Sequence, residues 1–152
     1  MENSIKVILP AISRNEALAR SIVAFFAVEL DPTIDELGDI KTAVSEAVTN
    51  CIVHGYPDGR PGDIEIYADI RGDAIHIEVS DSGVGIADIE AARRPFFTTA
   101  QGEERSGMGF TIMETFMDLL AVENREGGGL KVTMEKSLRR KIGVQSADAS
   151  AG

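Results

Sequence analysis

The sequence predicts an α+β fold, in which helices pack against one face of a β-sheet. Apolar residues recur at helical spacing through the first third of the chain. They then recur at every second position through the middle of the chain, which is typical of strands with one buried face. A glycine run at 127–129 joins two further strand-like stretches near the C-terminus.

The composition is that of a soluble globular protein with one core. The chain has 152 residues, of which 43% are hydrophobic and 26% charged, so we expect one domain over residues 1–137. Residues 138–152 become small and polar and are predicted to be a disordered tail. The net charge of −10 argues against nucleic acid as a direct partner, because phosphate binding needs a basic surface.

The chain shows no sign of export or membrane insertion. Neither a charged-then-apolar leader nor an apolar run of membrane-spanning length occurs. The single cysteine, Cys51, lies on an apolar helix face and is interpreted as a buried structural thiol. We therefore expect a cytoplasmic protein.

The N-terminal third predicts one strand and two helices. Residues 5–9 form an apolar run that indicates the strand. Residues 13–16 and 33–36 each have a capping-box pattern, with Ser13 and Thr33 as the expected caps. The first helix is expected to end near Leu30. The second is expected to end at Gly55, because glycine tolerates positive φ.

The rest of the chain predicts two hairpins separated by a long connection and a helix. Strands are expected at 64–70 and 75–79, and again at 121–124 and 130–136. Residues 87–106 contain one short helical piece, at 88–93, and are otherwise typical of a functional or mobile loop. A helix is then expected from Gly107 through Leu119.

Glu46 and Asn50 stand one turn apart on the second helix. At 100° per residue their side chains point within roughly 40° of each other. The apolar residues of the same helix centre on a direction roughly 140° away. The helix can therefore bury one face and hold this pair on the other, although any solvated helix face would have the same pattern.

Two glycine motifs could bind an anionic or flat ligand. Residues 81–85 read Asp-Ser-Gly-Val-Gly at a strand end, where Asp81 could accept a hydrogen bond from an amino group such as that of adenine. A plain turn would look the same. Residues 107–109 read Gly-Met-Gly before a helix, which is a possible phosphate site but neither a Walker loop nor a Rossmann fingerprint. Arg105 precedes them, where a cation could reach a terminal phosphate.

The order of these motifs resembles the ATP-binding superfamily of DNA gyrase, Hsp90, histidine kinases and MutL. The boxes that carry the resemblance are 46–50, 81–85 and 107–109, within a matching region of residues 5–136. The resemblance implies a two-layer α/β sandwich of the Bergerat type. Its sheet would be mixed but mostly antiparallel, and covered on one face by helices.

Within that superfamily the chain resembles the anti-sigma F factors, small serine kinases of spore-forming bacteria. This resemblance implies an ATP- and Mg²⁺-dependent homodimer that binds and inhibits a sporulation sigma factor. It also implies that the protein phosphorylates a serine of an anti-anti-sigma partner. The stretches that carry it are 15–16, 19–20, 30–33, 35–37, 44–50, 54–56, 97–99 and 104–114.

Carried over by position, the resemblance implies roles for individual residues. Asn50 would hold Mg²⁺ against the phosphates of ATP or ADP, and Glu46 would be the general base toward the serine hydroxyl. Asp81 would bind the adenine amine, with Thr133 assisting through water, and Arg105 would act at the phosphates. The remaining nucleotide contacts would come from Gly83, Gly85, Ile86, Thr98, Thr99, Ser106, Gly107, Met108, Gly109 and Phe110.

The resemblance also implies a lid over the nucleotide from Thr98 to Phe110. The sequence departs from the family at Ala100, where many relatives carry a lysine after the paired threonines that begin this lid. This departure shifts the expected phosphate contact toward Arg105.

Three functions fit these motifs to different degrees. The first is the serine kinase that doubles as an anti-sigma factor. The second is a nucleotide-gated, sigma-binding module without significant kinase activity, although such a module would not need a carboxylate at Glu46. The third, a histidine kinase domain, fits poorly because only a few residues precede the first strand.

For the partner surface we predict Glu16 and Arg20 on the first helix, because relatives present this helix to their partners. The alternative is that the two charges, four residues apart, simply pair with each other.

Overall fold

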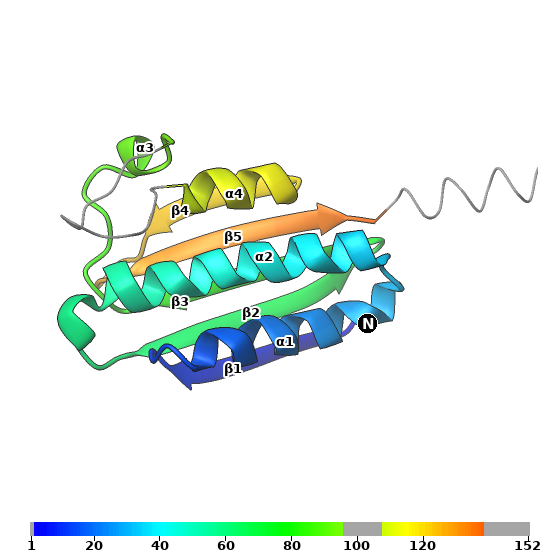
Figure 1. The fold of residues 1–152 in the computed structure, drawn as a ribbon, viewed down its shortest axis with the longest axis horizontal. Helices are drawn as coiled ribbons and strands as arrows, with labels where there is room; N and C mark the ends of the chain where they lie inside the picture. The colour runs from blue at the N-terminus through cyan, green and yellow to red at the C-terminus, as the bar shows by residue number, and fades with distance from the viewer. Residues whose placement is uncertain (1, 96–107, 139–152) are drawn as a thin grey trace, which may run out of the picture.

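The fold is a helical layer on one face of a five-stranded sheet. The computed structural model describes residues 2–95 and 108–138. The strands lie in the order β1-β2-β3-β5-β4, and every pairing between them is antiparallel (Figure 1). The predicted α+β sandwich is thus confirmed, with a sheet that is antiparallel rather than mixed over the described residues. The strands are β1 (Ser4–Pro10), β2 (Asp63–Arg71), β3 (Ala74–Asp81), β4 (Leu119–Asn124) and β5 (Leu130–Ser137).

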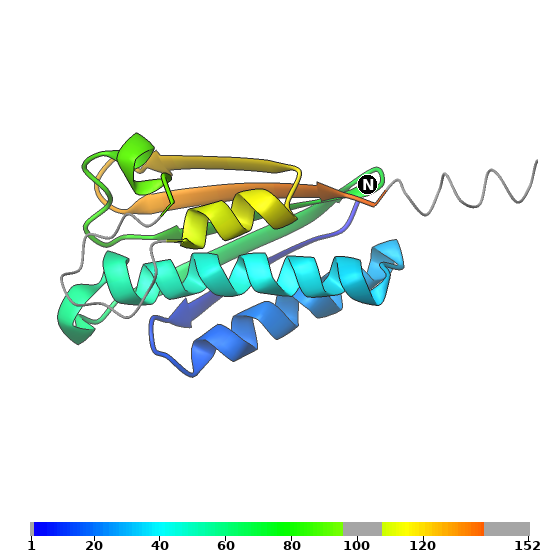
Figure 2. The ribbon, with the colours of Figure 1, turned by 45° about the horizontal axis from the view of Figure 1, so that its top comes forward.

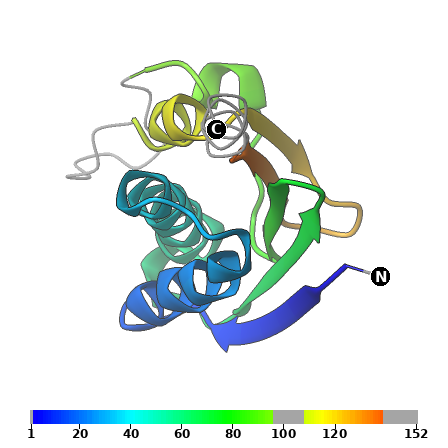
Figure 3. The ribbon, with the colours of Figure 1, turned by 90° about the vertical axis from the view of Figure 1, so that its right-hand side faces the viewer.

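Three helices run side by side across the sheet, and all three lie on the same face of it (Figures 2 and 3). They are α1 (Asn15–Ala27), α2 (Ile34–Asn50) and α4 (Gly109–Phe116). A short helix α3 (Ile89–Ala92) lies in the connection after β3, with a side-chain cap from Asp88. None of the helices in the described part of the chain is long and apolar enough to cross a membrane.

The core lies between the helices and the sheet. Alternate residues of β2 and β3 point into the core, as the period-two pattern predicts. The apolar face of α2 packs against them. Fully buried side chains from both layers make up its centre: Val23, Ile40, Val44, Val48, Ile64, Ile66, Ile75, Ile77, Val79, Met113, Val132 and Met134.

One of the two predicted capping boxes is present. The Thr33 hydroxyl accepts the main-chain N–H of Glu36 at 3.1 Å, and the Glu36 carboxylate accepts the N–H of Thr33 at 2.9 Å. The cap predicted at Ser13 is wrong. Helix α1 begins at Asn15 without a side-chain cap, because the Glu16 carboxylate bonds to groups further along α1 and on α2 instead.

Gly55 ends the second helix for a different reason from the one predicted. Helix α2 passes into a π-helical turn, η2 (Cys51–Gly55), and Gly55 is not among the residues with positive φ. A Cβ added at Gly55 would lie 2.9 Å from Oδ2 of Asp81. Glycine is needed here because the Asp81 side chain packs directly against the main chain.

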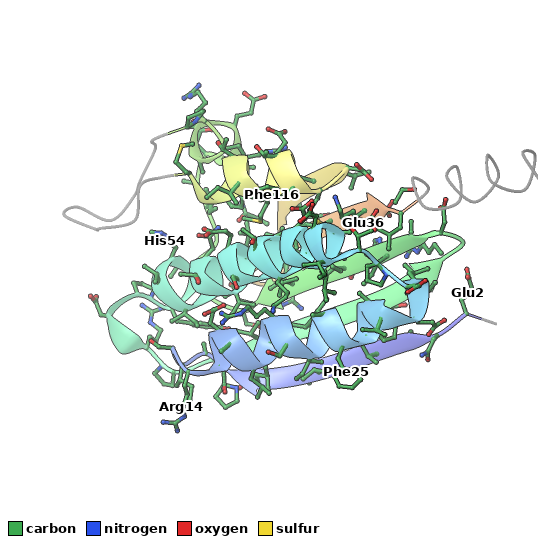
Figure 4. All side chains as sticks on the ribbon, turned by 45° about the vertical axis from the view of Figure 1, so that its right-hand side comes forward. Glu2, Arg14, Phe25, Glu36, His54 and Phe116 are labelled. Carbon is green, nitrogen blue, oxygen red and sulfur yellow. The ribbon has the colours of Figure 1, made fainter. Side chains whose placement is uncertain are left out.

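Helix α4 is shorter than the sequence predicts. It ends at Phe116, and Leu119 begins β4 instead of closing the helix. The Lys136 ammonium on β5 donates to the Phe116 carbonyl at 2.8 Å and lies 3.4 Å from the Asp39 carboxylate of α2. Figure 4 labels Phe116 and, near the start of α2, Glu36. This tertiary contact gives a main-chain carbonyl at the end of α4 its hydrogen-bond donor, although no capping pattern occurs there in the sequence.

The C-terminal boundary falls just after β5. Leu138 is buried and its main-chain N–H donates to the Asp73 carbonyl at 2.9 Å. Most of the tail predicted for 138–152 lies outside the described residues, and so do residues 98–107 of the lid that the resemblance implies from Thr98 to Phe110.

Candidate active site

Glu46 and Asn50 meet the start of α4. Helices α2 and α4 run antiparallel (Figure 1), so the first residue of α4 lies opposite the last turn of α2. A Cβ added at Gly109 would lie 3.4 Å from both amide atoms of Asn50 and 3.4 Å from Oε1 of Glu46. Both side chains are half-buried. A carboxylate, an amide and the main-chain N–H groups of a helix start therefore share one small space.

Asp81 lies at the end of β3 with its carboxylate buried, at 2% exposure. Its Oδ1 accepts the main-chain N–H of Gly83 at 2.9 Å and that of Leu130 at 3.3 Å. Its Oδ2 faces Gly55. The carboxylate is therefore held rigidly, as a buried charge must be, by fixed donors.

The glycine motif after β3 packs directly on the end of the second helix. A Cβ at Gly83 would lie 1.9 Å from the Gly55 carbonyl oxygen, which also accepts the N–H of Val84 at 3.0 Å. Only glycine fits at position 83, because any side chain there would collide with the main chain. The glycine motif is therefore more than a plain turn, because it packs against the end of the helix that carries Glu46.

Tyr56 is a site residue that the sequence motifs did not single out. Its buried hydroxyl donates to the Asp63 carbonyl and accepts the main-chain N–H of Ser82, both at 2.7 Å. It thereby fixes the glycine motif to the start of β2. Tyr56 stands beside His54 and Gly55, but its partner in the glycine motif, Ser82, is 26 residues away, and no local pattern signals that contact.

Cys51 packs beside Asp81 as a protonated thiol. Burial, then the charge of Asp81 and a hydrogen bond with its carboxylate, raise the pKa of the Cys51 thiol well above its usual range. A thiolate is therefore disfavoured here, which agrees with the structural thiol expected from the sequence.

Thr133 does not lie with Asp81. It pairs with Glu78 of β3 and alternates with the buried residues Val132 and Met134. Its side chain therefore faces the side of the sheet away from the helices, whereas Asp81 faces the helices. The group of β5 that meets Asp81 is the main-chain N–H of Leu130.

Other predicted nucleotide contacts are divided between two regions. Gly85 and Ile86 lie in the turn after β3, and Met108 and buried Phe110 lie at the start of α4. Five predicted residues lie outside the described residues: Thr98, Thr99, Arg105, Ser106 and Gly107.

Glu16 and Arg20 pair with each other on α1, as the alternative to a partner role foresees. Ser45 of α2 also donates to the Glu16 carboxylate. Burial alone would raise the pKa of Glu16, but the hydrogen bonds from Arg20 and Ser45 and the charge of Arg20 outweigh it and lower the pKa. Glu16 thus ties α1 to the residue next to Glu46, while Arg20 remains half-exposed.

The groups around the start of α4 have the chemistry that a nucleotide carrying Mg²⁺ would need. Gly109 brings the main chain of this helix start beside Asn50 and Glu46, and main-chain N–H groups at a helix start can bind phosphate. No group of three or more His, Cys, Asp or Glu among residues 2–95 and 108–138 could hold a metal by itself. Mg²⁺ carried by nucleotide phosphates needs only one or two protein oxygens, and the Asn50 amide can provide one.

Comparison with known proteins gives a consistent result. A family model described as the histidine kinase-like ATPase domain matches residues 9–136. The anti-sigma F factor of Thermoanaerobacter sp. (strain X514) is 60% identical over 124 residues, covering 82% of this chain and 86% of the relative. That of Clostridium beijerinckii is 50% identical over 135 residues, covering 89% of this chain and 94% of the relative.

Solved structures share the fold at low sequence identity. The RsbU and RsbW domains of Rv1364c from Mycobacterium tuberculosis superpose with a TM-score of 0.63 at 18% identity, covering 89% of this chain and 32% of that one. The catalytic domain of the histidine kinase ThkA gives a TM-score of 0.56 at 19% identity, covering 90% and 95%.

Proposed function

Because the chain belongs to the anti-sigma F factor family of histidine kinase-like ATPase domains, we propose that it is a serine kinase that inhibits a sigma factor. In this proposal, it binds a sporulation sigma factor when holding ATP and Mg²⁺. It also phosphorylates a serine of an anti-anti-sigma partner. The proposal further includes a cytoplasmic homodimer, the state that the family resemblance implies.

The observation that carries the kinase proposal is the meeting of Glu46 and Asn50 with the start of α4. Phosphoryl transfer needs positioned groups and a metal more than covalent chemistry from the protein. Asn50 would hold Mg²⁺ at the phosphates, and Asp81 would accept the adenine amine. ATP supplies the phosphoryl group, whose bond to ADP breaks as the serine oxygen bonds to phosphorus. Glu46, one turn from Asn50, would accept the serine proton.

Arg105 and the lid residues 98–99 and 106–107 are proposed to close around the phosphates. A cation at Arg105 would offset the charge that develops on the transferring group. Met108, Gly109 and Phe110 would continue this contact into α4, while Gly83, Gly85 and Ile86 would line the adenine side.

The direct test is to incubate the protein with ATP, Mg²⁺ and a candidate serine-bearing partner from the same organism. We expect one phosphate on a serine of the partner, detected by mass spectrometry, and none when Mg²⁺ is chelated. Binding of both partners without any phosphate transfer would contradict the kinase proposal and leave a nucleotide-gated binding module.

The proposed partner surface gives a separate prediction at Arg20. Replacing Arg20 by glutamate would place a second negative charge one turn from Glu16 and remove a half-exposed cation from α1. We expect Arg20→Glu to weaken binding of both the sigma factor and the serine-bearing partner by at least about tenfold, measured by isothermal titration calorimetry.

The matched control is Arg14→Glu, a charge reversal at the exposed start of the same helix, where Figure 4 labels Arg14 at the edge of the molecule. Equal affinities for the wild type and both variants would remove Arg20 from the partner surface.

A further inference from the structure

The turn between β4 and β5 contacts the glycine turn that follows β3. The β4–β5 turn comprises residues 124–129, and the glycine turn comprises residues 82–87. Their contacts join residues 38 to 44 positions apart in sequence, and none of the motifs used to assign the site includes the β4–β5 turn. Three of the contacts join a side chain to main-chain groups of residues 81 and 86, so they bear on the shape of the glycine turn itself.

Asn124 bonds to both main-chain groups of Ile86. Its Oδ1 accepts the Ile86 N–H at 2.9 Å, and its Nδ2 donates to the Ile86 carbonyl at 2.7 Å. Among neutral side chains only an amide supplies this donor and acceptor side by side. Gly85 allows the approach: its φ is +71°, and a Cβ there would lie 2.6 Å from Oδ1 of Asn124.

Arg125 holds the other end of the glycine turn. Its guanidinium donates to the Asp81 carbonyl oxygen at 2.8 Å and lies 3.5 Å from the Ser82 hydroxyl. The β4–β5 turn is itself closed, because the N–H of Arg125 donates to the Gly129 carbonyl at 2.8 Å. The β4–β5 turn that carries Asn124 and Arg125 is therefore itself held in place by a main-chain hydrogen bond.

The two halves of the glycine turn are held from different sides. The N–H groups of Ser82, Gly83 and Val84 bond to Tyr56, Asp81 and Gly55, on the side of the second helix. The main-chain groups of Ile86 bond to Asn124. Removing the Asn124 amide would therefore release the Gly85–Ile86 half while leaving the Asp81 half in place.

We propose that Asn124, supported by Arg125, is a positioning residue that holds the glycine turn in its nucleotide-binding shape. This inference rests on the proposed function in one respect, that the glycine turn lines the adenine nucleotide. A turn that is ordered in advance binds without a further entropy cost, whereas a loosened turn must be ordered by the ligand. The residue acts on affinity and not on the proton transfer at Glu46, which lies on a different element.

The test uses the full chain with Asn124→Ala. We expect affinity for a fluorescent ADP analogue to fall about thirtyfold, which corresponds to the loss of two ordinary hydrogen bonds. We expect the KM for ATP to rise by a similar factor and kcat at saturating ATP to stay within about twofold. Asn124→Asp keeps the acceptor and loses the donor, so it should lie between the wild type and Asn124→Ala.

Two further variants make the result specific. Glu126→Ala, an exposed residue of the same turn, should bind ADP as the wild type does. Arg125→Met should weaken ADP binding in the same direction as Asn124→Ala, and it tests the proposal through a second contact.

The proposal is overturned if Asn124→Ala binds ADP with wild-type affinity. A lower binding stoichiometry at unchanged affinity would also overturn it, since that is the mark of a merely structural role. If the wild type bound no ADP, the proposed function would fall with it. Wild-type binding with no effect of Asn124 or Arg125 would overturn this inference alone.

Discussion

Replacement of Glu46 by glutamine is expected to slow phosphate transfer by a factor of about 10² to 10⁴, the usual contribution of a general base. Glutamine keeps the shape of the side chain beside Gly109 but cannot accept the serine proton. Affinity for ATP and ADP should stay within about twofold, because in the proposed mechanism Glu46 faces the serine hydroxyl and Asn50 faces the metal. Single-turnover transfer of radiolabelled phosphate, beside an equilibrium titration of nucleotide, measures the two effects separately.

The control for Glu46 is Asp35→Asn, which removes an exposed carboxylate from the first turn of the same helix. It should transfer phosphate at the wild-type rate. Transfer by Glu46→Gln at the wild-type rate would exclude the general-base role. Loss of nucleotide binding in that variant would instead assign Glu46 to the nucleotide or its metal.

Replacement of Asp81 by asparagine is expected to lower ADP affinity by about 10²-fold, or about 2.7 kcal/mol. Oδ1 would still accept the N–H groups of Gly83 and Leu130. At the Oδ2 position, however, an amide NH₂ would replace an acceptor, so it could not receive the adenine amine and would be left facing a donor. Equilibrium titration with ADP gives the magnitude.

The same variant changes which base fits. An asparagine NH₂ can donate to the carbonyl oxygen of guanine, so the preference for ADP over GDP should fall by more than tenfold in Asp81→Asn. Cys51→Ala, which removes the neighbouring thiol but keeps the carboxylate, should retain the preference for ADP. Unchanged ADP affinity and unchanged base preference in Asp81→Asn would show that Asp81 does not recognise adenine.

The sequence patterns that predicted structure correctly depend on neighbours along the chain. The apolar face of α2 and the alternation in β2 and β3 are local, because each repeats the geometry of its own element. The capping box at Thr33 is equally local, and it forms as predicted. The box at Ser13 has the same pattern, a hydroxyl residue followed three positions later by glutamate, but it does not form, because the Glu16 carboxylate bonds to Arg20 and Ser45 instead.

Other predictions were wrong or incomplete where the structure depends on contacts between residues that are far apart in the sequence. The end of α4 is set by Lys136, a residue of the last strand, and nothing near Phe116 signals it. Glycine at position 55 was expected because it tolerates positive φ, but it is needed because the side chain of Asp81 packs against it. The strand register placed Leu130, not Thr133, beside Asp81, and a short motif contains no information on register.

Periodicity and motif order run along the chain, so the fold class, most element positions and the residue types of the candidate site could be predicted from the sequence. Which of those residues contact one another became clear only from the packing of the helices and strands. Helix α4 returns antiparallel to α2 and brings Gly109 to Glu46 and Asn50. The packing of Gly83 on Gly55 joins Asp81 to the same helix, and the β4–β5 turn adds Asn124 and Arg125. These contacts could not be predicted because they depend on packing and register between distant segments, which no local pattern encodes.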